Sequence, residues 1–179
     1  MYSVFIDWGY GIGEEVFCSY KVGEKLYNKL EQSGISVGMR PISNTLISLE
    51  ERISLIQHTK ADILICIDTN WSANVNQKGI ETYYNASSKK GELLAKKVQR
   101  ELIKATNLYN RGIISCSDKV NPSISRLLKA NEVSIVTLIG FYSNPHERLK
   151  IEQDIFKEKA SNGILNGIRK LYKTKGIFM

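Results

Sequence analysis

The segment ADILICIDTN (residues 61–70) decides the fold class. It is continuously apolar from Ile63 to Ile67 and is bounded by Asp62 and Asp68. A short apolar run of this kind is typical of a strand that is buried on both faces, as in parallel sheets covered by helices. The segment therefore predicts the central strand of an α/β fold.

Strand-like and helix-like patterns alternate on both sides of this segment. Five further stretches are predicted strands: residues 2–7, 35–40, 79–84, 112–115 and 133–141. Five amphipathic stretches are predicted helices: residues 14–34, 48–60, 89–105, 121–131 and 145–172. The alternation predicts a three-layer α/β/α sandwich around a mostly parallel, twisted sheet of about six strands. We expect residues 1–179 to form a single domain.

Local signals place several helix ends. Ser48 precedes Glu51 by three residues, which is the spacing of a capping box. Gly34 is the expected stop of the first helix. The last predicted helix has one apolar stripe, formed by Ile151, Ile155, Ala160, Ile164, Ile168 and Leu171.

Composition limits the partners and the compartment. The net charge is +7, but Lys and Arg are spread among Glu residues rather than gathered with aromatic residues, so we expect no nucleic-acid partner. No apolar run approaches the ~20 residues that span a bilayer, so we expect no membrane span. No signal peptide is recognised, so the protein is cytoplasmic or the chain lacks its leader, and the sequence leaves the localisation open. The three cysteines, Cys18, Cys66 and Cys116, are far apart, which favours reduced thiols in or near the core.

The candidate pocket lies where the predicted strands end, since ligands of such folds sit outside the carboxyl ends of the strands. This edge gathers WGYGIGEE (residues 8–15), DTNW (residues 68–71) and the residues around Gly140. The glycines of the first loop are spaced GxGxG rather than GxGxxG, and the next strand ends in Arg40 rather than in an acidic residue. Both features argue against a dinucleotide site.

Seven fragments in order resemble one family, the zinc-dependent N-acetylmuramoyl-L-alanine amidases of the AmiC/CwlV type. The fragments are IDWGYGI, LEQSGISVGMR, SLEER, ADILICIDTN, GIETYY, NRG and VTLIGFYSN, and they span nearly the whole chain. Members of that family cut stem peptides from the glycan of peptidoglycan. The resemblance implies the amidase-like fold and, as partners, peptidoglycan or its muropeptide fragments.

The resemblance also places the family's catalytic residues on this sequence. The family's zinc ligands, two histidines and a glutamate, correspond to Tyr10, Asp68 and Glu15, and its general-base glutamate corresponds to Leu138. Only Glu15 is kept. A tyrosine must lose a proton with a pKa of about 10 to ligate, an all-oxygen set suits harder ions than zinc, and a leucine accepts no proton. The sequence therefore predicts a pseudo-amidase without zinc, without another metal and without catalytic residues.

Three other side chains are candidates to replace the missing groups of the site. His58 falls late in a predicted helix and is expected at the surface. His146 begins the last predicted helix, and it is the histidine with a chance of reaching the pocket. Cys66 shares a strand face with Asp68, and a buried thiol is the expected role.

Three functions stay open from the sequence. The favoured one is a non-catalytic peptidoglycan-binding or regulatory module, which uses for its ligand Tyr10, Glu15, Asn70, Trp71 and Tyr142. The second is a protein–protein role, with a partner protein or as a homodimer. The third is a peptidoglycan hydrolase with altered ligands, in which Glu15 and Asp68 hold another metal or His146 is drawn in.

Overall fold

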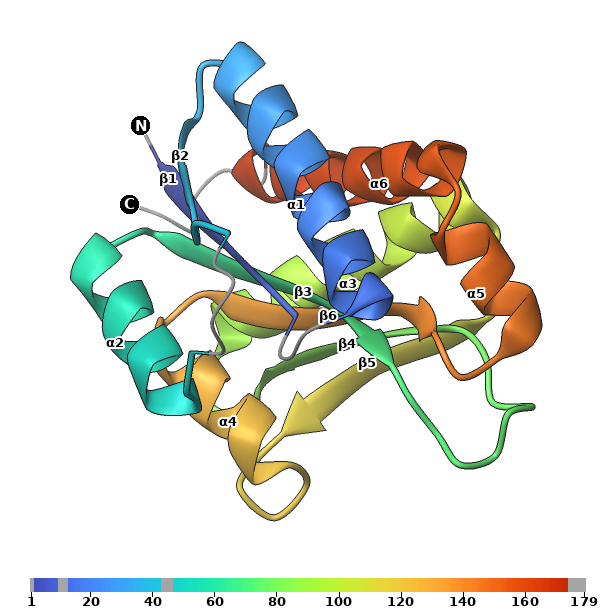
Figure 1. The fold of residues 1–179 in the computed structure, drawn as a ribbon. Coiled ribbons are helices and arrows are strands. Elements are labelled where there is room, and N and C mark those ends of the chain that lie inside the picture. The colour runs from blue at the N-terminus through green and yellow to red at the C-terminus, as the bar shows by residue number, and fades with distance from the viewer. Residues whose placement is uncertain (1, 10–12, 43–46, 174–179) are drawn as a thin grey trace.

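The computed structural model describes residues 2–9, 13–42 and 47–173. A six-stranded sheet has the order β2-β1-β3-β6-β4-β5 (Figure 1). The strands are β1 (Ser3–Trp8), β2 (Ser36–Met39), β3 (Ile63–Asn70), β4 (Ile80–Asn85), β5 (Asn110–Cys116) and β6 (Ser134–Phe141). The helices are α1 (Glu14–Gln32), α2 (Leu49–Thr59), α3 (Lys89–Thr106), α4 (Pro122–Lys129), α5 (Pro145–Ile151) and α6 (Asp154–Tyr172).

Helices cover both faces of the sheet, which confirms the predicted three-layer arrangement (Figure 1). One apolar core lies between the sheet and α1, α3 and α6, and it includes Ile65, Ile67, Leu94 and Ile164. A smaller core lies between the other face and the helices α2 and α4. β3 contributes to both cores because its successive side chains point to opposite faces. The prediction of a central strand buried on both faces is therefore confirmed.

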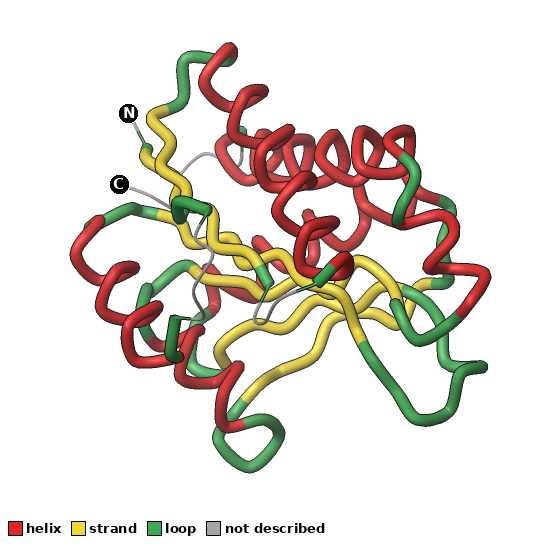
Figure 2. The backbone as a smooth tube through the Cα atoms, in the orientation of Figure 1, coloured by secondary structure: helices red, strands yellow, loops and turns green. Residues whose placement is uncertain are grey.

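The sheet is mostly parallel, as predicted, with one antiparallel pair. β1 pairs with β2 and β3, β3 with β6, and β4 with β5, all in parallel. β4 runs antiparallel to β6. The starts of β4 and β5 consequently lie at the same edge as the ends of β1, β3 and β6 (Figure 1). Figure 2 shows that loops follow the strands at this edge. The two cavities described below lie near this edge.

The predicted capping box, the predicted stop of the first helix and the predicted buried, reduced cysteines are all confirmed. Ser48 and Glu51 form both hydrogen bonds of a capping box at the start of α2. Gly34 follows the end of α1 with a φ of 71°, a left-handed conformation that glycine adopts without strain. The three cysteines are free and buried. Within the described part of the chain, no helix is long and apolar enough to cross a membrane.

The prediction of one long last helix is wrong, because two helices meet at residues 152–153. α5 ends at Ile151 and packs against β6, whereas α6 starts at Asp154 and lies across α1 and α3 (Figure 1). Because α6 is a separate helix that starts at Asp154, its buried face is displaced from the single apolar stripe that the sequence predicts. Phe156 is buried in place of Ile155, whose side chain is 59% exposed. A single periodic stripe could not anticipate this shift.

α6 packs on α3 at very short range through two glycines. A Cβ atom added at Gly163 would lie 2.8 Å from the Leu102 Cα, and one added at Gly167 would lie 2.6 Å from the Val98 Cα. Both contacts are with backbone, which cannot move aside as the end of a side chain can. The spacing of four residues places both glycines on one face of α6.

We expect Gly167→Ala to destabilise the protein by about 1–3 kcal/mol, because the added methyl group forces the two helices apart. Asn166→Ala, at the exposed neighbouring position, is the matched control and should cost less than about 0.5 kcal/mol. Urea unfolding followed by circular dichroism measures both. An equal effect of the two substitutions would contradict the close contact as the cause.

Candidate functional site

The structure brings two of the predicted site positions into direct register. Asp68 on β3 pairs with Leu138 on β6, so their side chains leave the same face of the sheet next to each other. An added Cβ at Gly9, directly after β1, would lie 3.2 Å from Asp68 Oδ1 and 3.3 Å from the Val16 side chain. The first turn of α1, which includes the half-buried Glu15, therefore borders Asp68. Tyr10 lies outside the described residues.

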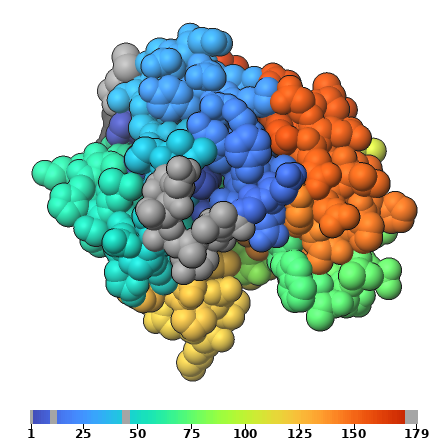
Figure 3. Space-filling model, viewed as in Figure 1, coloured from blue at the N-terminus to red at the C-terminus, as the bar shows by residue number. Residues whose placement is uncertain are grey.

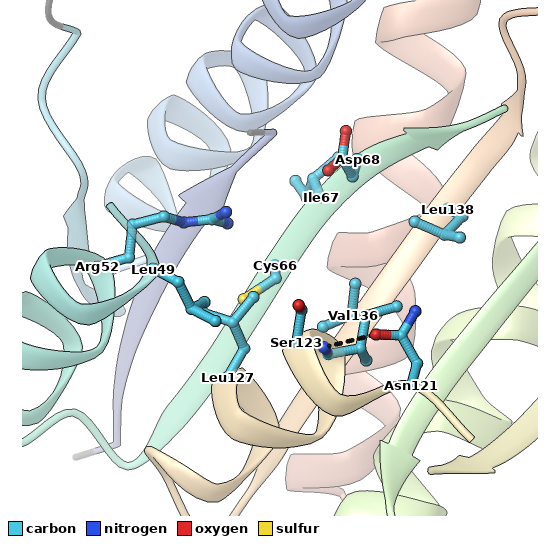
Figure 4. Close-up of a pocket in the computed structure, with 11 residues that line it drawn as sticks. Leu49, Arg52, Cys66, Ile67, Asp68, Asn121, Ser123, Leu127, Val136 and Leu138 are labelled. Carbon is cyan, nitrogen blue, oxygen red and sulfur yellow. Dashed lines mark hydrogen bonds between the residues drawn. The ribbon is translucent and has the colours of Figure 1, made fainter. Parts of the chain in front are cut away.

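A cavity of about 410 Å³ opens on this face of the sheet between α2 and α4. Figure 4 shows its walls: Leu49 and Arg52 come from α2, and Leu127 comes from α4. Its floor is made by β3 and β6, and the residues that they contribute are Cys66, Ile67, Asp68, Val136 and Leu138. Asn121, Ser123 and Ile124 close the side at the start of α4. The cavity is thus mostly apolar, with polar groups at its margin.

The start of α4, which forms one wall of the cavity, is held by a side-chain cap and a proline. Asn121 caps it, because its Oδ1 accepts a hydrogen bond from the Ile124 backbone N–H at 3.0 Å (Figure 4). Pro122 occupies the first turn, where its missing N–H has no helical partner to lose. Leu127 then points to the cavity, and Ser123 lies at the exposed side.

A buried ionic cluster lies beside the cavity. Asp7, fully buried on β1, accepts a hydrogen bond from Arg40 Nε at 2.5 Å on one oxygen and from Arg52 Nε at 3.1 Å on the other. Arg40 also donates to the backbone carbonyls of Trp8 and Gly9 and lies 3.7 Å above the Trp8 ring. The cluster therefore fixes the end of β1, from which the first site loop departs.

Cys66 lines the cavity on the same face as Asp68, as expected from its position on the strand. Burial raises the pKa of its thiol well above the usual range, and the nearby Asp7 carboxylate adds to this. The thiol therefore stays protonated, and a protonated thiol is neither a nucleophile nor a good metal ligand.

Glu81 is a central residue that the sequence interpretation missed. It lies on β4 directly opposite Leu138, so Asp68, Leu138 and Glu81 form one row across three strands. Its buried carboxylate accepts hydrogen bonds from Arg111 Nε at 2.6 Å, Asn70 Nδ2 at 2.8 Å and the Tyr83 hydroxyl at 2.9 Å. Both oxygens are engaged, one by a guanidinium, so Glu81 is a structural anchor rather than a base. The signal was present, since Glu81 and Arg111 stand in the GIETYY and NRG fragments.

The predicted ligand-binding side chains at the strand ends lie beside the cavity and do not line it. Asn70 is engaged with Glu81, and its Oδ1 accepts a hydrogen bond from the Trp71 backbone N–H at 2.9 Å. Trp71 is 68% exposed. The Tyr142 hydroxyl donates to Glu152 Oε1 at 2.6 Å, and burial together with this carboxylate raises the pKa of Tyr142. Their role in binding a ligand stays a prediction.

The two histidines lie away from the cavity. His58 is exposed near the end of α2, with Nδ1 2.6 Å from the Ser54 carbonyl oxygen, which confirms its expected place at the surface. His146 lines a different cavity, on the other side of the β3–β4 loop.

A hydrolytic zinc ion needs three nitrogen, sulfur or carboxylate ligands and a base for its water, and the described side chains alone do not supply that set. Among residues 2–9, 13–42 and 47–173, no three His, Cys, Asp or Glu side chains gather closely enough to hold a metal ion. The position beside Asp68, where a base would be needed, holds the aliphatic Leu138.

Comparison with known proteins places this fold. The model of the family described as N-acetylmuramoyl-L-alanine amidase matches residues 8–170. The N-acetylmuramoyl-L-alanine amidase LytC of Bacillus subtilis (strain 168) is 25% identical over 183 residues, which cover 96% of this chain and 36% of LytC.

Solved structures agree with this match. A crystal structure of an N-acetylmuramoyl-L-alanine amidase from Clostridium difficile 630 superposes with a TM-score of 0.85 at 28% identity, over 98% of both chains. The CwlD amidase from Clostridioides difficile, solved in complex with the GerS lipoprotein, has a TM-score of 0.87 at 22% identity, over 97% of this chain and 99% of CwlD. The chain, which shares its fold with cell wall amidases, belongs to the N-acetylmuramoyl-L-alanine amidase family.

Proposed function

We propose that this chain is a non-catalytic member of the amidase family that binds muropeptides in the cavity between α2 and α4. The observation that carries the proposal is the register of Leu138 with Asp68 at the floor of this cavity. An amidase needs a group that takes a proton from the attacking water, and a leucine side chain has no atom that accepts one. The neighbouring carboxylate, Glu81, is held by an arginine.

The cavity supports binding rather than chemistry. Its floor and walls offer apolar contacts from Val136, Leu138 and Leu127, which suit the small aliphatic side chains of a stem peptide. Asp68 and Asn121 at its margin offer polar groups that can orient a peptide. A volume of about 410 Å³ falls within the range of ordinary ligand pockets.

A substitution that closes the cavity mouth tests this proposal. We expect Ser123→Trp to lower the affinity for a soluble muropeptide by about tenfold or more, because the indole fills space that the ligand needs. Lys129→Trp, an exposed position at the end of the same helix that does not line the cavity, is the matched control and should bind as the unchanged protein does. Isothermal titration calorimetry measures the affinities.

The same samples, incubated with purified peptidoglycan, separate binding from hydrolysis. We expect retention on the peptidoglycan with no released peptide. Release of peptide that scales with protein concentration would instead favour the hydrolase with altered ligands, with Glu15 and Asp68 on another metal. No affinity for muropeptide or peptidoglycan would overturn the proposal.

A second function is favoured by one observation. Trp71 exposes 68% of its surface at the edge of the sheet, and a large exposed aromatic is typical of protein interfaces. CwlD, an amidase of the same fold, is known in complex with a lipoprotein. On this alternative the chain assembles with a partner protein or with itself. Size-exclusion chromatography with light scattering would detect a homodimer, and Trp71→Ala should dissociate it.

A further inference from the structure

A second cavity, of about 510 Å³, lies on the far side of the β3–β4 loop (residues 71–79). Three segments that are distant in sequence surround it: this loop, the turn between α3 and β5, and the start of α5. In Figure 3 the loop (green) projects beside the segment that contains α5 (orange). The side chains that matter for its chemistry are Asn76, Lys78, Asn107, Tyr109, His146 and Lys150.

Hydrogen bonds hold the walls of this cavity in place. Glu147, which is 5% exposed, accepts a hydrogen bond from the Gly79 backbone N–H at 2.8 Å and another from the Phe141 backbone N–H at 2.7 Å. Asn144 Nδ2 donates to the Val75 carbonyl at 2.9 Å. The β3–β4 loop is thereby tied to α5. The cavity is built from fixed backbone rather than from a chance gap between loops.

Gly79 allows the β3–β4 loop to lie close to Tyr109, in the turn between α3 and β5. An added Cβ there would lie 2.5 Å from the Tyr109 carbonyl oxygen, and the glycine has a φ of 106°, so no other residue fits without strain. The Ile80 backbone N–H also donates to that same carbonyl at 2.9 Å. Tyr109 is thus held directly against the loop that carries Lys78.

The charge of the cavity is positive. Lys78 comes from the loop and Lys150 from α5, and neither forms an ion pair within the part of the chain that the structure describes. The single carboxylate among the lining residues, Glu147, already has both oxygens engaged by backbone N–H groups. His146 adds a ring that can donate a hydrogen bond. The cavity therefore favours an anion.

The uncharged side chains that line the cavity indicate the chemistry of the part of the ligand that carries no charge. The Tyr109 side chain is 61% exposed and offers an apolar face, on which a sugar ring can stack. The amides of Asn76 and Asn107 can both donate to and accept from hydroxyl groups. A volume of about 510 Å³ is far larger than a free inorganic anion needs.

We propose that this second cavity binds an anionic sugar, whose charged group lies between Lys78 and Lys150 and whose ring lies on Tyr109. The site is separate from the cavity that holds Asp68 and Leu138, so it does not rest on the function proposed for that cavity. The anionic group is a phosphate or a carboxylate, since lysine binds either as a point charge.

Isothermal titration calorimetry with three sugars tests the proposal. We expect glucose 6-phosphate or glucuronic acid to bind and glucose not to bind, and the stronger of the two acids identifies the charged group. The affinity should fall as sodium chloride is raised, since salt screens the attraction. In Lys78→Gln/Lys150→Gln it should fall by about tenfold or more, because two charged hydrogen bonds are lost.

Lys119→Gln/Lys159→Gln is the matched control, since it removes the same charge at two exposed positions outside the cavity. Its affinity should equal that of the unchanged protein. Tyr109→Ala should lower the affinity for whichever acid binds, because the face on which the sugar ring stacks is lost. The proposal is overturned if neither acid binds, if glucose binds as well as they do, or if both double variants lose affinity equally.

Discussion

Asp7→Asn is expected to lower the free energy of unfolding by about 3–5 kcal/mol, which is a large part of the ~5–15 kcal/mol that a domain of this size has. The substitution keeps the size of the side chain and removes its charge. Arg40 and Arg52, which are 6% and 4% exposed, then remain buried side by side without the carboxylate that binds both of them. Leaving a buried charge unpaired costs far more than the loss of an ion pair at the surface.

Urea unfolding at constant pH measures this effect as a shift of the transition midpoint at unchanged slope. Asp118→Asn is the matched control, because Asp118 also loses its ion pair, with Lys129 at 2.7 Å, but both partners are exposed. That control should cost less than about 1 kcal/mol. A loss below about 1 kcal/mol for Asp7→Asn as well would show that the buried cluster does not hold the end of β1.

The triple substitution Tyr10→His, Asp68→His and Leu138→Glu is expected to create a zinc site where the proposed pseudo-amidase has none. Two imidazoles and the native Glu15 supply a ligand set that zinc prefers, and the new glutamate stands beside position 68 by the register of β3 and β6. Affinity for zinc should rise by a factor on the order of 10³ or more, since even the partners that orient metal ligands are worth 10–100-fold each.

Zinc content after dialysis, and competition with a chromophoric chelator, measure this gain without reference to activity. Zinc should also raise the melting temperature of the triple variant, because it binds the folded state only. The control Tyr10→His/Asp68→Asn/Leu138→Gln keeps the new histidine at position 10 but places amides at positions 68 and 138, and amides are poor zinc ligands. Leu138→Glu alone reports the cost of placing a carboxylate at a position that is 8% exposed. A folded triple variant that binds no more zinc than its control would contradict the assignment of these positions.

The sequence allowed the layers and the central buried strand to be anticipated, because the relevant signals are local. The apolar run at residues 63–67 needs cover on both faces wherever it is placed, and the Ser48–Glu51 box forms within a single turn. The break between α5 and α6 escaped prediction because Ile155 and Phe156 are both apolar. Only packing against α1 and α3 selects which of the two is buried.

The site was anticipated in part. Asp68 was expected at the pocket because it follows a recognisable strand, and Leu138 was named through the resemblance of VTLIGFYSN to the amidase family; the structure pairs the two residues on neighbouring strands. Glu81 was missed because its importance comes from Arg111 and Asn70, which lie 30 and 11 positions away in sequence. The α4 wall and the second cavity likewise depend on segments that meet only after folding.

The position of α6 in the fold has a consequence for how the protein is made. Its buried residues, such as Phe156, Ile164 and Ile168, complete the core that α1 and α3 share with the sheet. Because α6 is the last element of the fold, the six strands of the sheet are synthesised before it. During that time the apolar faces of α1 and α3 that α6 covers in the folded protein are exposed. Folding of this layer must therefore finish after translation has passed residue 172, and the nascent chain needs protection from aggregation up to that point.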